Sequence, residues 1–135
     1  LLHIGDGDLH LNFGADTVSA TFDHPREGES EYLPRIPPLR AWLGLHYHSP
    51  RWTGRIETRW VDDQTNLADN ETPTDGYTLL NASVGYTFLF ATQSLDLILR
   101  GTNLTNQDAR RQTSYLKDSV PLPGRDINLF LRLNF

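Results

Sequence analysis

The feature that most constrains this chain is the alternation of apolar and polar side chains along several segments. It is clearest over residues 126–135, where every second side chain is apolar and only Phe130 departs from the pattern. A period of two is typical of a β-strand, because successive side chains point to opposite faces of a sheet. The segment is therefore predicted to be the edge strand of a soluble β-sandwich or the closing strand of a membrane β-barrel, which crosses a bilayer in about ten residues.

The same alternation returns earlier in the chain and predicts an all-β fold with six antiparallel strands. The five earlier predicted strands cover residues 9–22, with a β-bulge near residues 16–17, and residues 39–48, 51–61, 76–88 and 95–102. Residues 1–4 have the character of the end of a further strand, followed by a tight turn.

The predicted connections alternate between long and short. The long ones cover residues 24–38, 62–75 and 103–125, and all three fall at the same side of the sheet. Outer-membrane barrels sort their connections in this way, with short periplasmic turns and long outer loops. A soluble sandwich has no reason to do so, and the sequence therefore favours the barrel.

The two faces of the predicted sheet differ in charge. The apolar face carries no ionisable side chain in the middle of the strands. The polar face carries several, which would line a wet lumen: Arg40, Arg55, Glu57, Arg59, Asp96 and Arg100. Six strands cannot enclose such a lumen, so further strands are expected before residue 1. The absence of Met at position 1 fits a processed form or a fragment. The net charge of −5 argues against a nucleic-acid partner.

Three stretches resemble the carboxyl-terminal end of TonB-dependent outer-membrane receptors. They are ETPTDGYTLLNASVGYTF (71–88), LRGTNLTNQDARRQTSYLKDSVPLPGRD (99–126) and the last strand, which ends on Phe135. The NLTNQDAR and PLPGR segments are the most specific parts, and LPRIPPLR (33–40) entering a strand also fits. Within the family, the details resemble the branch linked to uptake of zinc and other metals.

The resemblance implies that residues 1–135 form the carboxyl-terminal portion of a transmembrane barrel of about 22 strands with a plugged lumen. The plug domain, the earlier strands and the segment that contacts TonB are implied to lie outside these residues. The implied function is import of a scarce substrate, a metal ion or a metal chelate such as a siderophore, across the outer membrane of a Gram-negative bacterium. Arg40, Arg55, Arg59 and Arg100 are interpreted as docking against the plug.

The resemblance also implies partners. These are outer-membrane lipid, the TonB complex through the amino-terminal region, and the barrel-assembly machinery. That machinery would read the last strand through its alternating apolar positions: Leu129, Leu131, Leu133 and Phe135. No cofactor is expected. No enzyme activity is expected either, because the sequence has no phosphate loop, HExxH motif, nucleophile elbow or paired Cys. The alternatives left open are a passive porin or adhesin barrel and a soluble β-sandwich binding module.

Two groups of residues are candidate binding sites. His46 and His48 lie two apart on one strand face, so both imidazoles could reach one metal ion, or they simply line a wet wall. The predicted outer loops carry further candidates for substrate contact: His24, Glu27, Asp62, Asp63, Arg110, Arg111 and Lys117. Acidic loops attract cations, and the alternative is a solvated surface that keeps the barrel mouth polar. The basic last loop suits an anionic chelate, and the alternative is pairing with lipopolysaccharide phosphates or with acidic neighbours.

Overall fold

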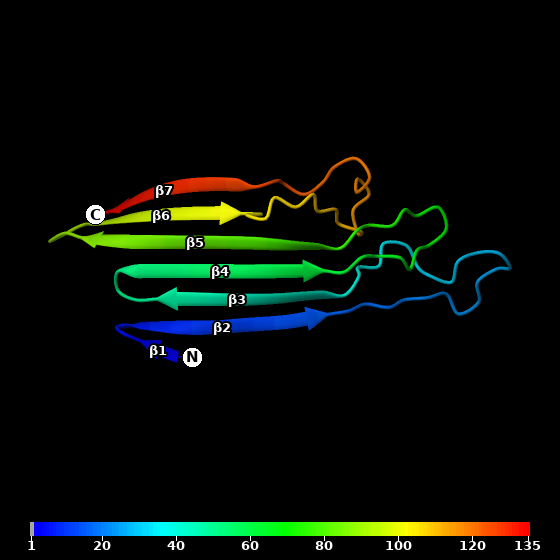
Figure 1. The fold of residues 1–135 in the computed structure, drawn as a ribbon, viewed down its shortest axis with the longest axis horizontal. Helices are drawn as coiled ribbons and strands as arrows, with labels where there is room; N and C mark the ends of the chain where they lie inside the picture. The colour runs from blue at the N-terminus through cyan, green and yellow to red at the C-terminus, as the bar shows by residue number, and fades with distance from the viewer. Residues whose placement is uncertain (1) are drawn as a thin grey trace.

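The computed structural model describes residues 2–135, which form one antiparallel sheet in which each strand pairs with the next along the chain (Figure 1). The strands are β1 (Leu2–Ile4), β2 (Gly7–Asp16), β3 (Arg40–His48), β4 (Trp52–Val61), β5 (Tyr77–Leu89), β6 (Ser94–Thr102) and β7 (Asp126–Asn134). Within residues 2–135, no helix is long and apolar enough to cross a membrane. The single antiparallel sheet confirms the all-β fold class.

The connections are sorted as the sequence predicts. Long connections leave β2, β4 and β6 at the same end of the sheet, on the right in Figure 1, and the short ones lie at the other end. We refer to residues 17–39 as loop 1, residues 62–76 as loop 2 and residues 103–125 as loop 3.

The predicted strand over residues 9–22 is wrong beyond Asp16. β2 ends at Asp16, opposite Arg40 at the start of β3, and no bulge carries it further. The residues before Arg40 include Pro37 and Pro38, which lack the N–H that a ladder requires. Only one isolated bridge, Thr21 with Tyr32, continues the pairing into loop 1. The other strand boundaries lie within one or two residues of the predicted ones, and the stump at residues 1–4 is confirmed as β1 over the described residues 2–4.

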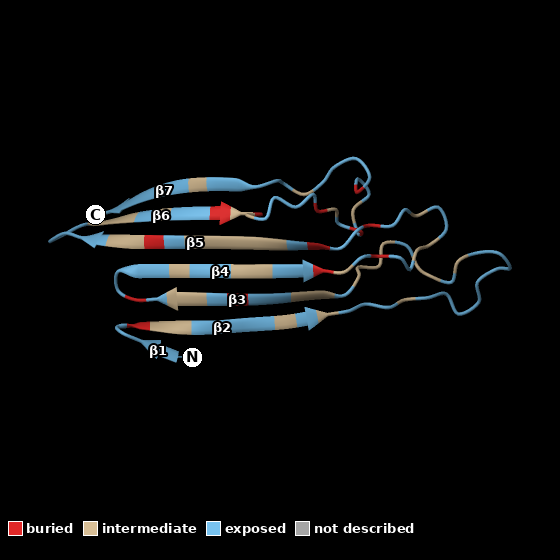
Figure 2. Cartoon of the chain, in the orientation of Figure 1, coloured by how far each residue is buried: buried red, intermediate tan, exposed pale blue. Residues whose placement is uncertain are grey.

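Strand register separates the two faces of the sheet. Directly opposed residues share a face in an antiparallel pair, so Leu11, Leu45, Ile56 and Ala82 form one apolar row. Their neighbours Asn12, Gly44, Glu57 and Asn81 form a polar row on the opposite face. Many large apolar side chains remain exposed on the sheet (Figure 2). An apolar area of this extent in a soluble protein would promote aggregation, whereas lipid satisfies it.

The buried apolar cluster of the described residues lies at the loop end of the sheet. Val61 at the end of β4, Tyr77 at the start of β5 and Ala109 in loop 3 form it, with Leu79 and Leu122 packed against them. Figure 2 marks buried positions at the loop ends of β4 and β5 and within the loops. The loops are therefore folded onto the sheet.

Candidate functional site

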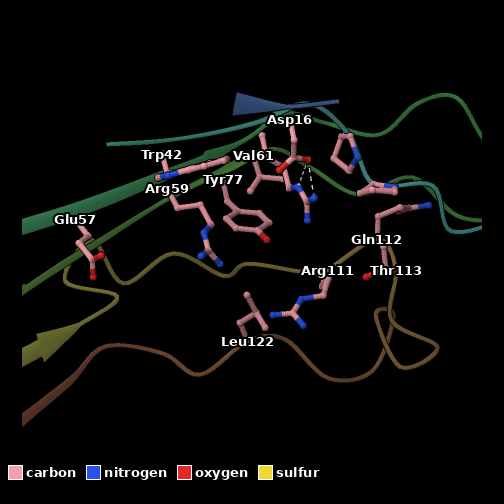
Figure 3. Close-up of a pocket in the computed structure, with 13 residues that line it drawn as sticks. Asp16, Trp42, Glu57, Arg59, Val61, Tyr77, Arg111, Gln112, Thr113 and Leu122 are labelled. Carbon is pink, nitrogen blue, oxygen red and sulfur yellow. Dashed lines mark hydrogen bonds and ion pairs between the residues drawn. The ribbon is translucent and has the colours of Figure 1, made fainter. Parts of the chain in front are cut away.

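A cavity of about 630 Å³ lies on the polar face, where the strands meet the long loops (Figure 3). β2, β3, β4, β5 and loop 3 all contribute side chains to its lining, among them Asp16, Arg40, Trp42, Arg59, Tyr77 and Arg111. The cavity-lining side chains of β3 and β4 lie on one face of the sheet, because Trp42 is directly opposed to Arg59 and every second side chain points to the same face.

The indole of Trp42 is positioned by a glycine on the neighbouring strand. Gly14 is directly opposed to Trp42, and a Cβ built on Gly14 would lie 2.2 Å from Trp42 Cζ2. Real Cβ atoms do not approach other atoms so closely, so the ring occupies space that only glycine leaves free. This contact holds the Trp42 ring in the lining of the cavity.

Some charged groups that line the cavity have an ion-pair partner in the described part of the chain and others have none. Arg40 donates to Asp16 Oδ1 from Nε at 2.8 Å and from Nη2 at 2.6 Å. Glu57 accepts a hydrogen bond from Arg55 Nη2 at 2.5 Å. Among residues 2–135, the guanidinium groups of Arg59 and Arg111 have neither a salt bridge nor a hydrogen bond. The cavity therefore carries two unpaired positive charges, which attract an anion.

Gln112 joins the cavity wall to the interior of the loop layer. It lines the cavity and is 3% exposed. Its Oε1 accepts hydrogen bonds from Thr74 Oγ1 at 2.9 Å and from Lys117 Nζ at 2.9 Å. The segment of loop 3 that carries Arg111 is therefore attached to loop 2.

His46 and His48 lie on the polar face of β3, near its short-turn end. His46 Nε2 is 3.8 Å from Glu57 Oε1, and the register places His10 of β2 directly opposite His46. In the part of the chain that the structure describes, no three His, Asp or Glu side chains converge to hold a metal ion. A metal contact at His46 and His48 stays a prediction, with His10 as a neighbour that the sequence argument missed.

The predicted loop contacts do not gather at one point. His24, Glu27 and Asp63 are exposed in loops 1 and 2, and Asp62 is half-buried. Arg110 donates to the Lys117 carbonyl at 2.7 Å, and the Lys117 side chain is buried. Of the seven predicted loop residues, only Arg111 lines the cavity.

Other site residues had only weak sequence signals. Trp42 and Tyr77 sit on the polar face of predicted strands, which alone does not distinguish a site aromatic from a wall aromatic. Asn103 begins the NLTNQDAR segment and fastens the two ends of loop 3. Its Nδ2 donates to Gln107 O at 2.9 Å and to Pro123 O at 3.0 Å, which ties NLTNQDAR to the PLPGR segment.

The predicted assembly signal lies on and beyond the last strand. Leu129, Leu131 and Leu133 project from the apolar face of β7 and are exposed. Phe135 follows the end of β7 and is 94% exposed. Their exposure is compatible with contact to lipid or to another protein.

An antiparallel meander with one apolar face, short turns at one end and long loops at the other defines the wall of an outer-membrane-type β-barrel. The model of a protein family described as "TonB dependent receptor-like, beta-barrel" matches residues 5–104, which is more than half of the chain. The chain therefore belongs to this family. A search of the curated proteins finds no match.

Membership in the family gives the general function. Its members are receptors and transporters of the outer membrane of Gram-negative bacteria, they act with TonB, and they are not enzymes. The resemblance to the receptors is thus confirmed at the level of the family.

Proposed function

We propose that this chain forms barrel wall and three outer loops of a receptor that imports a scarce metal as an anionic chelate, and that the cavity beneath the loops binds it. The proposal rests on one observation: two guanidinium groups without a salt bridge among the described residues, those of Arg59 and Arg111, line one cavity. A bare metal cation would be repelled by these groups, whereas the carboxylate or hydroxamate oxygens of a chelate accept their hydrogen bonds. Trp42 adds an aromatic face for the organic part of the ligand.

The remaining predicted contacts have secondary roles in this proposal. His24, Glu27, Asp62 and Asp63 keep the outer surface polar around the entrance, and Lys117 is omitted from ligand contact because it is buried. His46 and His48 supply a transient metal contact nearer the short turns, since two side chains fall short of the three or four ligands of a stable site.

The last strand has a proposed role in assembly. We assign Leu129, Leu131, Leu133 and Phe135 to recognition by the barrel-assembly machinery, supported by their exposure along one side of the strand and beyond it. After insertion, the three leucines face lipid.

The function is tested by ligand binding to the full-length receptor in detergent, with Fe(III)–citrate as an anionic probe and Zn²⁺ as a cationic one. The variant Arg59→Gln with Arg111→Gln is expected to weaken binding of Fe(III)–citrate at least about 100-fold, because each of the two charge-assisted hydrogen bonds contributes about 1.5–3 kcal/mol. The matched control is Arg100→Gln, an arginine of the polar face that does not line the cavity. Equal affinity of the double variant and the wild type, or tighter binding of Zn²⁺ than of Fe(III)–citrate, would overturn the proposal.

A further inference from the structure

Lys117 is the only lysine of the chain, and its side chain is only 7% exposed. Lysine is rarely buried, because removing its ammonium group from water is costly unless the group is fully paired. Lys117 Nζ donates to Gln112 Oε1 at 2.9 Å and to the Thr72 carbonyl, and it lies 3.9 Å from Glu71 Oε1. Three acceptors therefore surround a group that has three donors.

The carboxylate beside Lys117 extends the network to loop 1. Glu71 is 10% exposed, and its Oε1 accepts a hydrogen bond from the Arg35 backbone N–H at 3.0 Å. Its Oε2 accepts one from the Ala68 N–H within loop 2 at 3.3 Å. Arg35 belongs to loop 1, Glu71 to loop 2 and Lys117 to loop 3, so all three long loops meet at one pair of opposite charges.

Two neighbouring contacts join the same loops independently. Thr72 Oγ1 of loop 2 donates to Asp118 Oδ1 of loop 3 at 2.6 Å. The Arg35 guanidinium of loop 1 lies 3.1 Å from the ring centroid of Tyr115 in loop 3, a cation–π contact. We refer to the Lys117–Glu71 pair and these two contacts together as the joint. The joint therefore has a buried pair of opposite charges at its centre and further contacts between the loops around it.

The joint also reaches the cavity. Lys117 holds Gln112, and Gln112 directly follows Arg111, one of the two unpaired guanidinium groups. Loss of the amine would release the Gln112 side chain from one of its two partners and loosen the backbone that directs Arg111 into the cavity.

We propose that Lys117 is a positioning residue. It fastens the three outer loops into one unit, and it holds Arg111 at the cavity. The statement about Arg111 rests on the proposed function, whereas the statement about the loops does not.

The joint is tested without any ligand, by hydrogen exchange of the full-length receptor in lipid nanodiscs. Lys117→Met retains the length of the side chain and removes the amine. We expect exchange at least 10-fold faster at the Arg35 amide of loop 1 and the Gln64 amide of loop 2, as well as in loop 3, with unchanged protection in the strands. Arg125→Met is the matched control, because it removes an exposed positive charge from the same loop.

A milder variant guards against failure of Lys117→Met to fold. Thr72→Val removes the hydrogen bond to Asp118 without leaving a buried charge unpaired, and faster exchange is again expected in all three loops. Faster exchange confined to the loop that carries the substitution, for either variant, would overturn the idea of a single unit.

The positioning role is tested by a double-mutant cycle with Fe(III)–citrate. Lys117→Met is expected to weaken binding about 10-fold, and to have no further effect in an Arg111→Gln background. An equal loss in both backgrounds would show that Lys117 does not act through Arg111. A wild-type receptor that does not bind the probe would overturn the proposed function and the positioning role, while hydrogen exchange still decides whether the loops form one unit.

Discussion

The sheet and the loop layer of this molecule are stabilised in opposite ways. The strands satisfy their backbone groups through a regular ladder from β1 to β7 and leave large side chains exposed, such as Leu131 on the apolar face. The loops have few β-ladder hydrogen bonds between backbone groups. The buried apolar cluster of the described residues lies at the base of the loops, with Ala109 fully buried.

This difference shows what each region needs from its surroundings. A strand with paired backbone groups needs only a solvent that suits each face, which in an outer-membrane barrel is lipid on one side and a wet lumen on the other. A loop must satisfy its own backbone groups, and here buried polar side chains such as Asn103, Gln64 and Lys117 do so. Substitutions in the two regions should therefore destabilise the protein for different physical reasons.

The largest expected effect is that of a charge on the apolar face. Leu131→Arg would place a guanidinium in lipid near the middle of β7 and is expected to destabilise the folded barrel by about 3 kcal/mol. The measurement is reversible folding of the full-length receptor into lipid vesicles, which contain no assembly machinery.

The matched control for Leu131→Arg is Phe130→Arg, at the adjacent position on the opposite, polar face of β7. We expect it to cost less, although Phe130 is the larger apolar residue. If Phe130→Arg were the more damaging of the two, the assignment of the faces would be reversed.

A smaller effect, confined to the loop layer, is expected from Asn103→Ala. Asn103 is 4% exposed and has a positive φ of 46°, which Asn tolerates better than Ala. Losing its two side-chain donors to Gln107 O and Pro123 O is expected to destabilise loop 3 by about 2 kcal/mol. Hydrogen exchange at the Leu122 amide, which donates to Ala109 O, reports the change.

Asn66→Ala is the control for Asn103→Ala, since Asn66 is an exposed asparagine of loop 2. It should leave the exchange of loop 3 unaltered. Unchanged protection of Leu122 in Asn103→Ala would mean that the loop layer does not depend on its buried polar groups.

The smallest effect is expected where the two regions meet, at Gly14. Gly14→Val would collide with the Trp42 ring and is expected to cost about 1 kcal/mol, because the half-exposed indole can move aside. Fluorescence of Trp42, measured with all other tryptophans of the protein replaced by Phe, should shift as the ring leaves its position.

Gly54→Ala is the control for Gly14→Val, because a Cβ on Gly54 would meet only ordinary contact, 3.8 Å from Tyr47 Cβ. An indole spectrum that is the same in Gly14→Val and the parent would show that Trp42 is not held by Gly14.

The sequence anticipated most of the sheet and little of the site. Alternation located the strands from β3 to β7 because each alternating segment is matched by a partner of similar length. It failed over residues 17–22, where the apolar pattern continues but the facing segment contains prolines. The site was only partly anticipated, because Arg111 and Lys117 are six positions apart in one loop yet one lines the cavity and the other is buried.

The sequence by itself determined the strand order, the two faces and the sorting of long and short connections, because these depend on a period of two along neighbouring segments. Only the tertiary structure decided which charges are paired, that Lys117 joins three loops, and that Gly14 makes room for Trp42. Such contacts join residues far apart in the chain, and no local pattern records which of several similar side chains will meet.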